Sequence, residues 1–108
     1  MQNVIYKGFD NPVIFEFVFT GEFSTDGLSN FTYMSVEIGG ETYTTNGTPD
    51  QLFLNGNNEL RLKIGDTTTL DAGSYRPEIV GFSATYNDGY LLSGALNKQL
   101  DSTIKVKA

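Results

Sequence analysis

Residues 60–75 read Leu-Arg-Leu-Lys-Ile-Gly-Asp-Thr-Thr-Thr-Leu-Asp-Ala-Gly-Ser-Tyr, and this stretch decides the fold. The apolar residues Leu60, Leu62 and Ile64 alternate with basic residues. An apolar side chain at every second position is typical of a strand with one buried face. The turn that follows leads into Asp71-x-Gly73-x-Tyr75. A strand, a turn and a tyrosine in this order predict the corner of a β-sandwich.

The candidate structural corner consists of Asp71, Gly73, Tyr75 and Pro77. In immunoglobulin-like domains a tyrosine at the start of strand F donates its hydroxyl to the backbone of the preceding connection, while its ring stays in the core. The spacing here resembles that arrangement. Pro77 stands where antibody domains carry their second cysteine, and the chain has no tryptophan, which excludes an antibody-type domain. Because proline cannot donate a ladder hydrogen bond, we expect an edge or a bulge at this point.

The other segments predict a single all-β domain over residues 1–108, an Ig-like β-sandwich of seven to nine short, mainly antiparallel strands. Gly39-Gly40 predicts a tight hairpin turn, and Asn87-Asp88-Gly89 predicts a second hairpin with a type I′ turn. The apolar parity changes near Ile79-Val80, which indicates a bulge there or burial on both faces. One helical turn is expected within 94–101. The strands are expected near 2–7, 13–19, 31–38, 41–45, 52–54, 59–64, 74–85, 90–92 and 103–107.

Several inward-facing residues follow from the same alternation. Phe23 and Leu28 are expected to anchor the polar loop 20–30. The strand residues expected in the core are Val13, Phe15, Phe17, Phe19, Met34, Val36, Ile38, Ile104 and Val106.

The composition removes most catalytic chemistry. The chain of 108 residues has no cysteine and no histidine, so thiol nucleophiles, imidazole bases and the usual zinc ligands are excluded. Its net charge of −6 disfavours nucleic acid and anionic membrane surfaces. Carboxylates on predicted strands are more often solvated than catalytic, so we expect no enzyme and no cofactor. These carboxylates are Glu16, Glu37, Glu41 and Glu78.

One group of oxygen-bearing residues invites comparison with a calcium site. It contains Asn46, Asp50, Asn55, Asn57, Asn58 and Glu59. No Asp-x-Asp-x-Asp-Gly loop is present, and Asn, Asp and Gly are the residues that turns require. We therefore expect turns and no metal.

A second resemblance covers more of the chain. In order, the sequence has Tyr6-Lys7-Gly8-x-Asp10, an aromatic strand, Leu28-Ser29-Asn30-Phe31, a Leu-x-Leu strand, Gly73-Ser74-Tyr75 and Asn87-Asp88-Gly89. This order resembles small structural proteins of tailed bacteriophages, in particular the N-terminal domains of baseplate upper proteins and other Ig-like virion modules. The resemblance implies a protein that decorates a capsid, joins head to tail, or attaches a receptor-binding protein.

The candidate contact surface is built on tyrosines and a hairpin tip. Tyrosine beside small polar residues is typical of adaptable binding surfaces, and the alternative is cross-strand packing that stabilises the hairpin. Tyr33 and Tyr43 are expected to form an outward aromatic strip. The full set is Tyr86, Asn87, Asp88, Gly89, Tyr90, Tyr33 and Tyr43.

The first and last strands are expected at sheet edges, where a partner strand can add. Lys105 and Lys107 alternate with Ile104 and Val106, as in an edge guarded against pairing.

These patterns favour a non-enzymatic structural or assembly module. With the resemblance, they predict a virion component made in the bacterial host cytoplasm without a signal peptide, whose partners are other virion proteins or copies of itself. No nucleic-acid or membrane partner is expected. The alternative is a carbohydrate-binding or adhesion module that uses exposed tyrosines, so a glycan stays open as a ligand.

Overall fold

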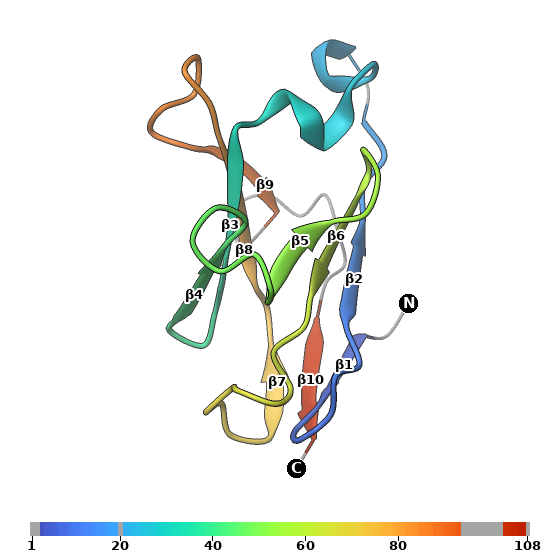
Figure 1. Ribbon diagram of the computed structural model, residues 1–108, viewed down its shortest axis with the longest axis vertical. Coiled ribbons are helices and arrows are strands. Elements are labelled where there is room, and N and C mark those ends of the chain that lie inside the picture. The colour runs from blue at the N-terminus through green and yellow to red at the C-terminus, as the bar shows by residue number, and fades with distance from the viewer. Residues whose placement is uncertain (1–2, 20, 94–102, 108) are drawn as a thin grey trace.

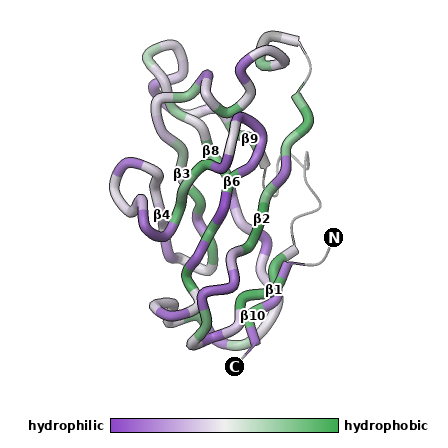
Figure 2. Tube along the Cα trace, turned by 45° about the vertical axis from the view of Figure 1, so that its right-hand side comes forward, coloured by the Kyte–Doolittle hydropathy of each residue, from purple (hydrophilic) through white to green (hydrophobic). Residues whose placement is uncertain are grey.

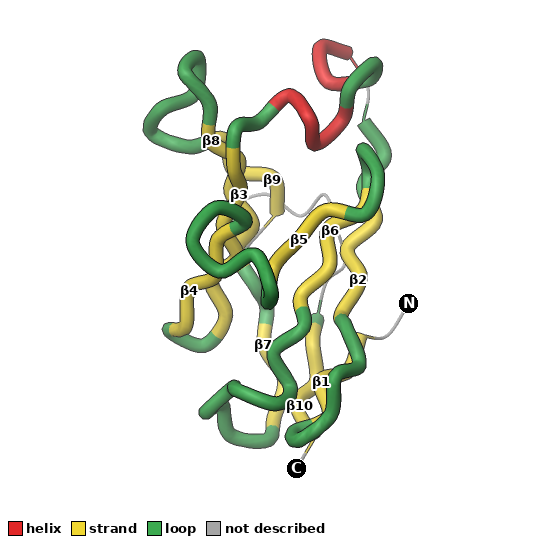
Figure 3. Tube along the Cα trace, in the orientation of Figure 1, coloured by secondary structure: helices red, strands yellow, loops and turns green. Residues whose placement is uncertain are grey.

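The computed structural model describes residues 3–19, 21–93 and 103–107 (Figure 1). These ranges contain ten strands and two short 3-10 helices. The strands are β1 (Asn3–Tyr6), β2 (Val13–Glu16), β3 (Tyr33–Ile38), β4 (Glu41–Thr44), β5 (Leu52–Leu54), β6 (Glu59–Leu62), β7 (Gly73–Tyr75), β8 (Glu78–Phe82), β9 (Tyr90–Ser93) and β10 (Ile104–Lys107). The helices are η1 (Gly21–Phe23) and η2 (Gly27–Asn30), both in the loop between β2 and β3 (Figure 3).

The strands form two facing layers. One layer is the sheet β2-β6-β5, and the other begins with the sheet β4-β3-β8-β9. The third sheet, β1-β10-β7, extends the second layer, because β7 runs directly into β8 (Figure 1). Every pairing is antiparallel except that of β1 with β10. The predicted all-β sandwich of mainly antiparallel strands is confirmed, with ten strands in the described ranges where seven to nine were expected.

The core lies between the layers and is filled by the apolar face of each strand. Leu60, Leu62 and Ile64 are fully buried, as their alternation predicts, and Figure 2 shows this alternation along β6. The expected core faces of the other strands and the loop anchors Phe23 and Leu28 are also buried, with Phe19 packed against the core. At roughly 1.5–3 kcal/mol per large apolar side chain, this burial is the main stabilising contribution.

The predicted strand over 74–85 is divided. β7 ends at Tyr75 and β8 begins at Glu78, so Arg76 and Pro77 separate them. β7 is an edge strand, as the missing donor of Pro77 predicts, whereas β8 is central. The bulge is also confirmed, because the register of β8 with β9 shifts between Ile79 and Val80.

The two predicted hairpin turns differ in outcome. Gly39 and Gly40 have φ of +56° and +87°, and Ile38 pairs with Glu41, as a two-residue turn requires. The predicted second hairpin is present, because β8 and β9 pair antiparallel, but its type I′ turn at Asp88-Gly89 is wrong, because Asp88 does not have positive φ. Instead Gly89 has φ +99° and donates its N–H to the Tyr86 carbonyl at 3.1 Å. The connection between β8 and β9 is thus a longer loop.

The prediction about sheet edges is half right. β1 lies at an edge, but β10 lies between β1 and β7. Lys105 and Lys107 are exposed and Ile104 and Val106 buried. A central strand with one solvated face gives the same alternation as a guarded edge, so the pattern could not separate the two. The helical turn expected within 94–101 lies outside the described residues.

Candidate functional site

The corner closes with the bond that its spacing predicts. The hydroxyl of Tyr75 donates to the backbone carbonyl of Asp71 at 2.7 Å, and the ring packs against the core. Asp71 therefore contributes its backbone to this bond, while Pro77 is buried just beyond it. Asp71, Gly73, Tyr75 and Pro77 form a structural joint.

A second contact reinforces this joint. Gly39, in the β3–β4 turn, lies so close that an added Cβ would be 2.4 Å from Cδ2 of Leu70 and 3.0 Å from Cε1 of Tyr75. The turn therefore packs directly against the corner.

Glu41 is the charged centre of this region, and no sequence motif indicates its role. Its Oε1 accepts hydrogen bonds from the Tyr43 hydroxyl at 2.7 Å and the Thr68 hydroxyl at 2.8 Å. Its Oε2 accepts from the Thr69 hydroxyl at 2.6 Å and the Thr69 N–H at 3.1 Å. The carboxylate thus ties β4 to the loop that leads into the corner.

These bonds set the protonation state of the group. Burial alone would raise the pKa of Glu41, but the hydrogen bonds from Thr69, Tyr43 and Thr68 outweigh it and lower that pKa to about 2. Burial and the bond to the Glu41 carboxylate raise the pKa of Tyr43. Glu41 is therefore ionised at neutral pH and acts as a structural acceptor.

The length of the turn at 39–40 fixes the register of β3 with β4, and this register puts Glu41 and Tyr43 on the inward face. It pairs Ile38 with Glu41 and Val36 with Tyr43, so Tyr43 shares the buried face of Val36. Tyr43 is only 8% exposed, so its half of the predicted outward strip is wrong, whereas Tyr33 lies on the outer face of the sheet beside Ser35 and Glu37, as expected. There Tyr33 stacks on Phe82 across β3 and β8, with ring centroids 4.7 Å apart.

Three loops meet at one end of the sandwich, here called the loop end. They are residues 21–32, 55–58 and 83–89 (Figure 1). The first two are joined by hydrogen bonds: the Leu28 N–H donates to the Asn57 carbonyl at 2.6 Å, and the Ser29 hydroxyl donates to Asn57 Oδ1 at 2.8 Å. Gly27 permits this approach, because its φ is +55° and an added Cβ would be 2.4 Å from the Asn57 carbonyl oxygen.

Aromatic rings join the third loop to the first. The rings of Tyr86 and Tyr90 meet edge to face with centroids 5.1 Å apart, so the two tyrosines pack together as the packing alternative expects, although Tyr86 lies in the loop and only Tyr90 is on a strand. The ring of Phe23 packs against both, with its centroid 6.1 Å from that of Tyr86 and 5.1 Å from that of Tyr90. Their rings thus support the loop end, while Asn87 and Asp88 remain exposed at the tip.

β2 presents an open edge beside this end. Among the described strands, β2 pairs only with β6. Val18, two residues after β2, is 89% exposed, the highest value among the large apolar residues described. A hollow of about 390 Å³ lies alongside it. Its lining residues are Glu16, Phe17, Val18, Asn55, Asn57, Asn58 and Glu59.

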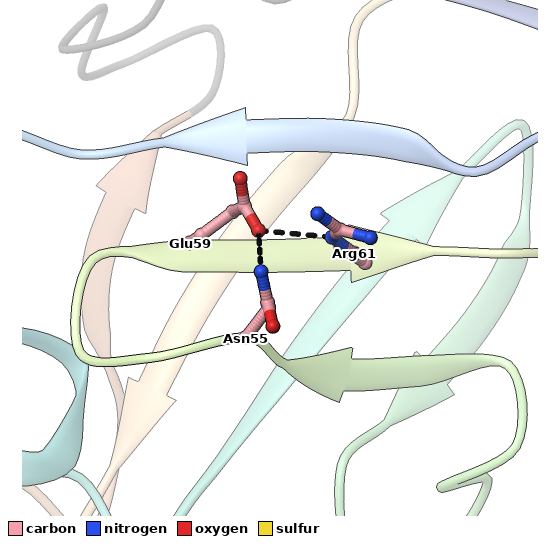
Figure 4. A network of polar contacts seen from close by, with 3 residues as sticks. All are labelled: Asn55, Glu59 and Arg61. Carbon is pink, nitrogen blue, oxygen red and sulfur yellow. Dashed lines mark hydrogen bonds and ion pairs between the residues drawn. The ribbon is translucent and has the colours of Figure 1, made fainter.

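A polar network fixes the wall of this hollow (Figure 4). The Glu59 carboxylate accepts hydrogen bonds from the Asn55 amide and from Arg61 Nε, the latter at 2.9 Å. These two bonds lower the pKa of Glu59. The Glu59 charge is therefore already balanced within the chain.

A second hollow, of about 400 Å³, lies beside the β4–β5 connection. The Gln51 amide donates to the Thr67 hydroxyl at its side, at 2.9 Å. Its lining residues are Gly47, Thr48, Pro49, Asp50, Gln51, Lys63, Asp66 and Thr67.

In the part of the chain that the structure describes, no three acidic side chains come together as a metal site would require. Of the six oxygen-bearing residues compared with a calcium site, Asn55, Asn57, Asn58 and Glu59 line the hollow beside Val18, whereas Asn46 and Asp50 lie in the 45–51 connection.

Among the strand carboxylates, Glu37 and Glu78 are direct cross-strand neighbours. Both are exposed on the open face of their sheet, and neither lines the two hollows.

No helix in the described ranges has the length and apolar character needed to cross a membrane. Comparison of the chain with protein-family models, curated proteins and solved structures gives no match.

Proposed function

We propose that the protein is a non-enzymatic structural module of a larger assembly, with a tailed-bacteriophage virion as the leading context. In that setting it would decorate the capsid or belong to the neck, tail or baseplate, in contact with other virion proteins or with copies of itself. The order of short motifs from Tyr6 to Gly89 that resembles small phage structural proteins supports this setting.

The observation that carries the proposal is the exposure of Val18. Val18 is 89% exposed beside an open hollow and next to the edge of β2 that no described strand pairs with, so a partner that covers this edge would also remove apolar surface from water. Phe9, which is 64% exposed in the turn after β1, adds a second apolar contact point at the other end of the molecule.

The polar groups of the fold support a rigid scaffold. The carboxylates of Glu41 and Glu59 are committed to hydrogen bonds that hold loops and strands together. Glu41 and Glu59 therefore stabilise the fold. Because the chain also has no imidazole and no thiol, a binding role fits its side chains better than a catalytic one.

The tyrosines of the predicted contact surface favour a protein partner over a sugar. A sugar-binding face needs an exposed ring on which the sugar can stack. Tyr43 is buried, Tyr86 and Tyr90 pack against the core, and the outer-face ring of Tyr33 is stacked on Phe82, which covers one of its sides.

Sedimentation of native particles or lysate tests the assembly proposal. We expect the protein to sediment with particles. Val18→Asp should reduce this association with little change in melting temperature, and Val18→Thr, of similar shape, should reduce it less. A protein that stays monomeric and sediments alone in every fraction would contradict an assembly role.

A further inference from the structure

We infer that the open edge of β2 receives an extended, basic strand of a partner protein, which adds to the sheet β2-β6-β5 beside Glu16. The inference rests on the proposed assembly function and names the chemistry of its partner.

The backbone of β2 points half of its groups away from the protein. Phe17 donates its N–H to the Asn58 carbonyl at 2.8 Å, and Phe15 pairs with Leu60. In an antiparallel ladder, residues two apart present their backbone groups to the same side. The N–H and C=O groups of Ile14, Glu16 and Val18 therefore face outward, where no described strand pairs with them.

Such an edge selects an extended backbone. A row of alternating donors and acceptors is complementary to another strand, and proteins use it for recognition by strand addition. The side chains then set specificity, because those of Ile14, Glu16 and Val18 share one face of the sheet. A strand laid along the edge meets an apolar, an acidic and an apolar residue in turn.

Charge decides between a second copy and a different partner. Two copies of β2 that pair antiparallel with full overlap place Glu16 opposite Glu16 and Ile14 opposite Val18. Like charges directly opposite each other destabilise a sheet, so Glu16 opposes self-pairing. A basic residue at that position forms a favourable pair. Glu59, the other carboxylate of the hollow, already has Arg61 as its partner, which leaves Glu16 to select the incoming charge.

A matched set of blocked peptides tests the inference on the full chain. The test peptide is acetyl-Thr-Val-Thr-Lys-Thr-Val-Thr-amide, which presents a Val, Lys, Val row. The second peptide has Glu in place of Lys. The third is the Lys peptide with N-methyl groups on the residues whose N–H would face β2. Binding is followed by NMR titration, and strand addition by hydrogen exchange of the protein amides.

We expect the Lys peptide to bind at least about two-fold more tightly than the Glu peptide. The N-methylated peptide should not bind. The amides of Ile14, Glu16 and Val18 should become protected. Glu16→Lys should reverse the preference between the Lys and Glu peptides, whereas Glu37→Lys, the same charge change on β3, should leave it unaltered.

Three results would overturn the inference: no binding, equal binding of the Lys and Glu peptides, or protection at other amides. Protection of the three β2 amides that rises with protein concentration and without peptide would assign the edge to a second copy instead. If Glu16→Lys still sediments with particles while the peptides fail to bind, the assembly function stands and the β2 inference fails.

Discussion

The carboxylate of Glu41 accepts a hydrogen bond from the hydroxyl of Thr68 at 2.8 Å, and these two residues are 27 positions apart in the chain. The bond ties the β3–β4 hairpin to the loop before β7, on the same side as the Tyr75–Asp71 bond. In the same region, Gly39 of the β3–β4 turn packs against the side chain of Leu70 in the loop before β7. The corner is therefore held by local and long-range contacts together.

Glu41→Gln should destabilise the fold. The amide keeps one acceptor oxygen but replaces the other with donors, which face the Thr69 N–H and hydroxyl. We expect a loss of about 1–2 kcal/mol in the free energy of unfolding, measured by urea titration at neutral pH. Glu37→Gln, on the exposed face of β3, makes the same chemical change as a control; because it removes the repulsion with Glu78, it should raise stability by less than about 0.5 kcal/mol. Equal effects of the two changes would contradict the role of Glu41.

The same carboxylate should make stability depend on pH. Its pKa is about 2 in the folded state against 4.5 unfolded, so the unfolded chain binds the proton more readily. The contribution of Glu41 is then complete above about pH 5 and is lost as the pH falls toward 2. Unfolding experiments across this range should show the difference between the native protein and Glu41→Gln shrinking with acidity. A difference that is constant with pH would refute the assignment.

Tyr75→Phe removes the corner hydrogen bond and leaves the ring in place. Because the Asp71 carbonyl is exposed, water can replace the lost donor. We therefore expect a cost of about 0.5–1.5 kcal/mol, visible as a lower melting temperature. Tyr6→Phe, in an exposed tyrosine of β1, provides a comparison that should melt like the native protein. An unchanged melting temperature for Tyr75→Phe would argue against the corner.

Features that depend on residues close together in the sequence were predicted correctly. The alternation of Leu60, Leu62 and Ile64 places these residues in the core, and the spacing from Asp71 to Tyr75 produces the corner bond. The parity change at Ile79 likewise located the bulge, whereas Pro77 predicted an edge or a bulge and the structure has a break between β7 and β8 there.

The misplaced features depend on partners distant in sequence. β10 is central because β1 pairs with one of its sides and β7 with the other. The alternation of apolar and basic residues within β10 does not indicate how many neighbours the strand has. Tyr43 is buried because the turn at 39–40 pairs it with Val36, a consequence that period-two reading of residues 41–45 alone does not reveal. Of the predicted contact residues, Asn87 and Asp88 are exposed, whereas no motif in the sequence points to Val18, which is 89% exposed.

Gly39→Ala should cost more than Gly40→Ala. Both glycines have positive φ, which disfavours any residue with a Cβ by roughly 1–2 kcal/mol. At Gly40 no atom lies within 4 Å of the added Cβ, whereas at Gly39 Leu70 and Tyr75 must also move. Urea unfolding of the two variants isolates the packing term. Equal losses would show that the turn and the corner are not in contact.

Glu78→Lys should stabilise the protein. Glu37 and Glu78 are paired directly across β3 and β8 on an exposed face, and like charges in that position repel. Replacing one with lysine turns the pair into an attractive one and should add about 0.2–1 kcal/mol to the free energy of unfolding at low salt. The gain should shrink at high salt because the ions screen an exposed pair. Glu78→Gln removes the repulsion without adding attraction, so its gain should be smaller. If Glu78→Lys stabilises equally in a Glu37→Gln background, the effect does not come from this pair.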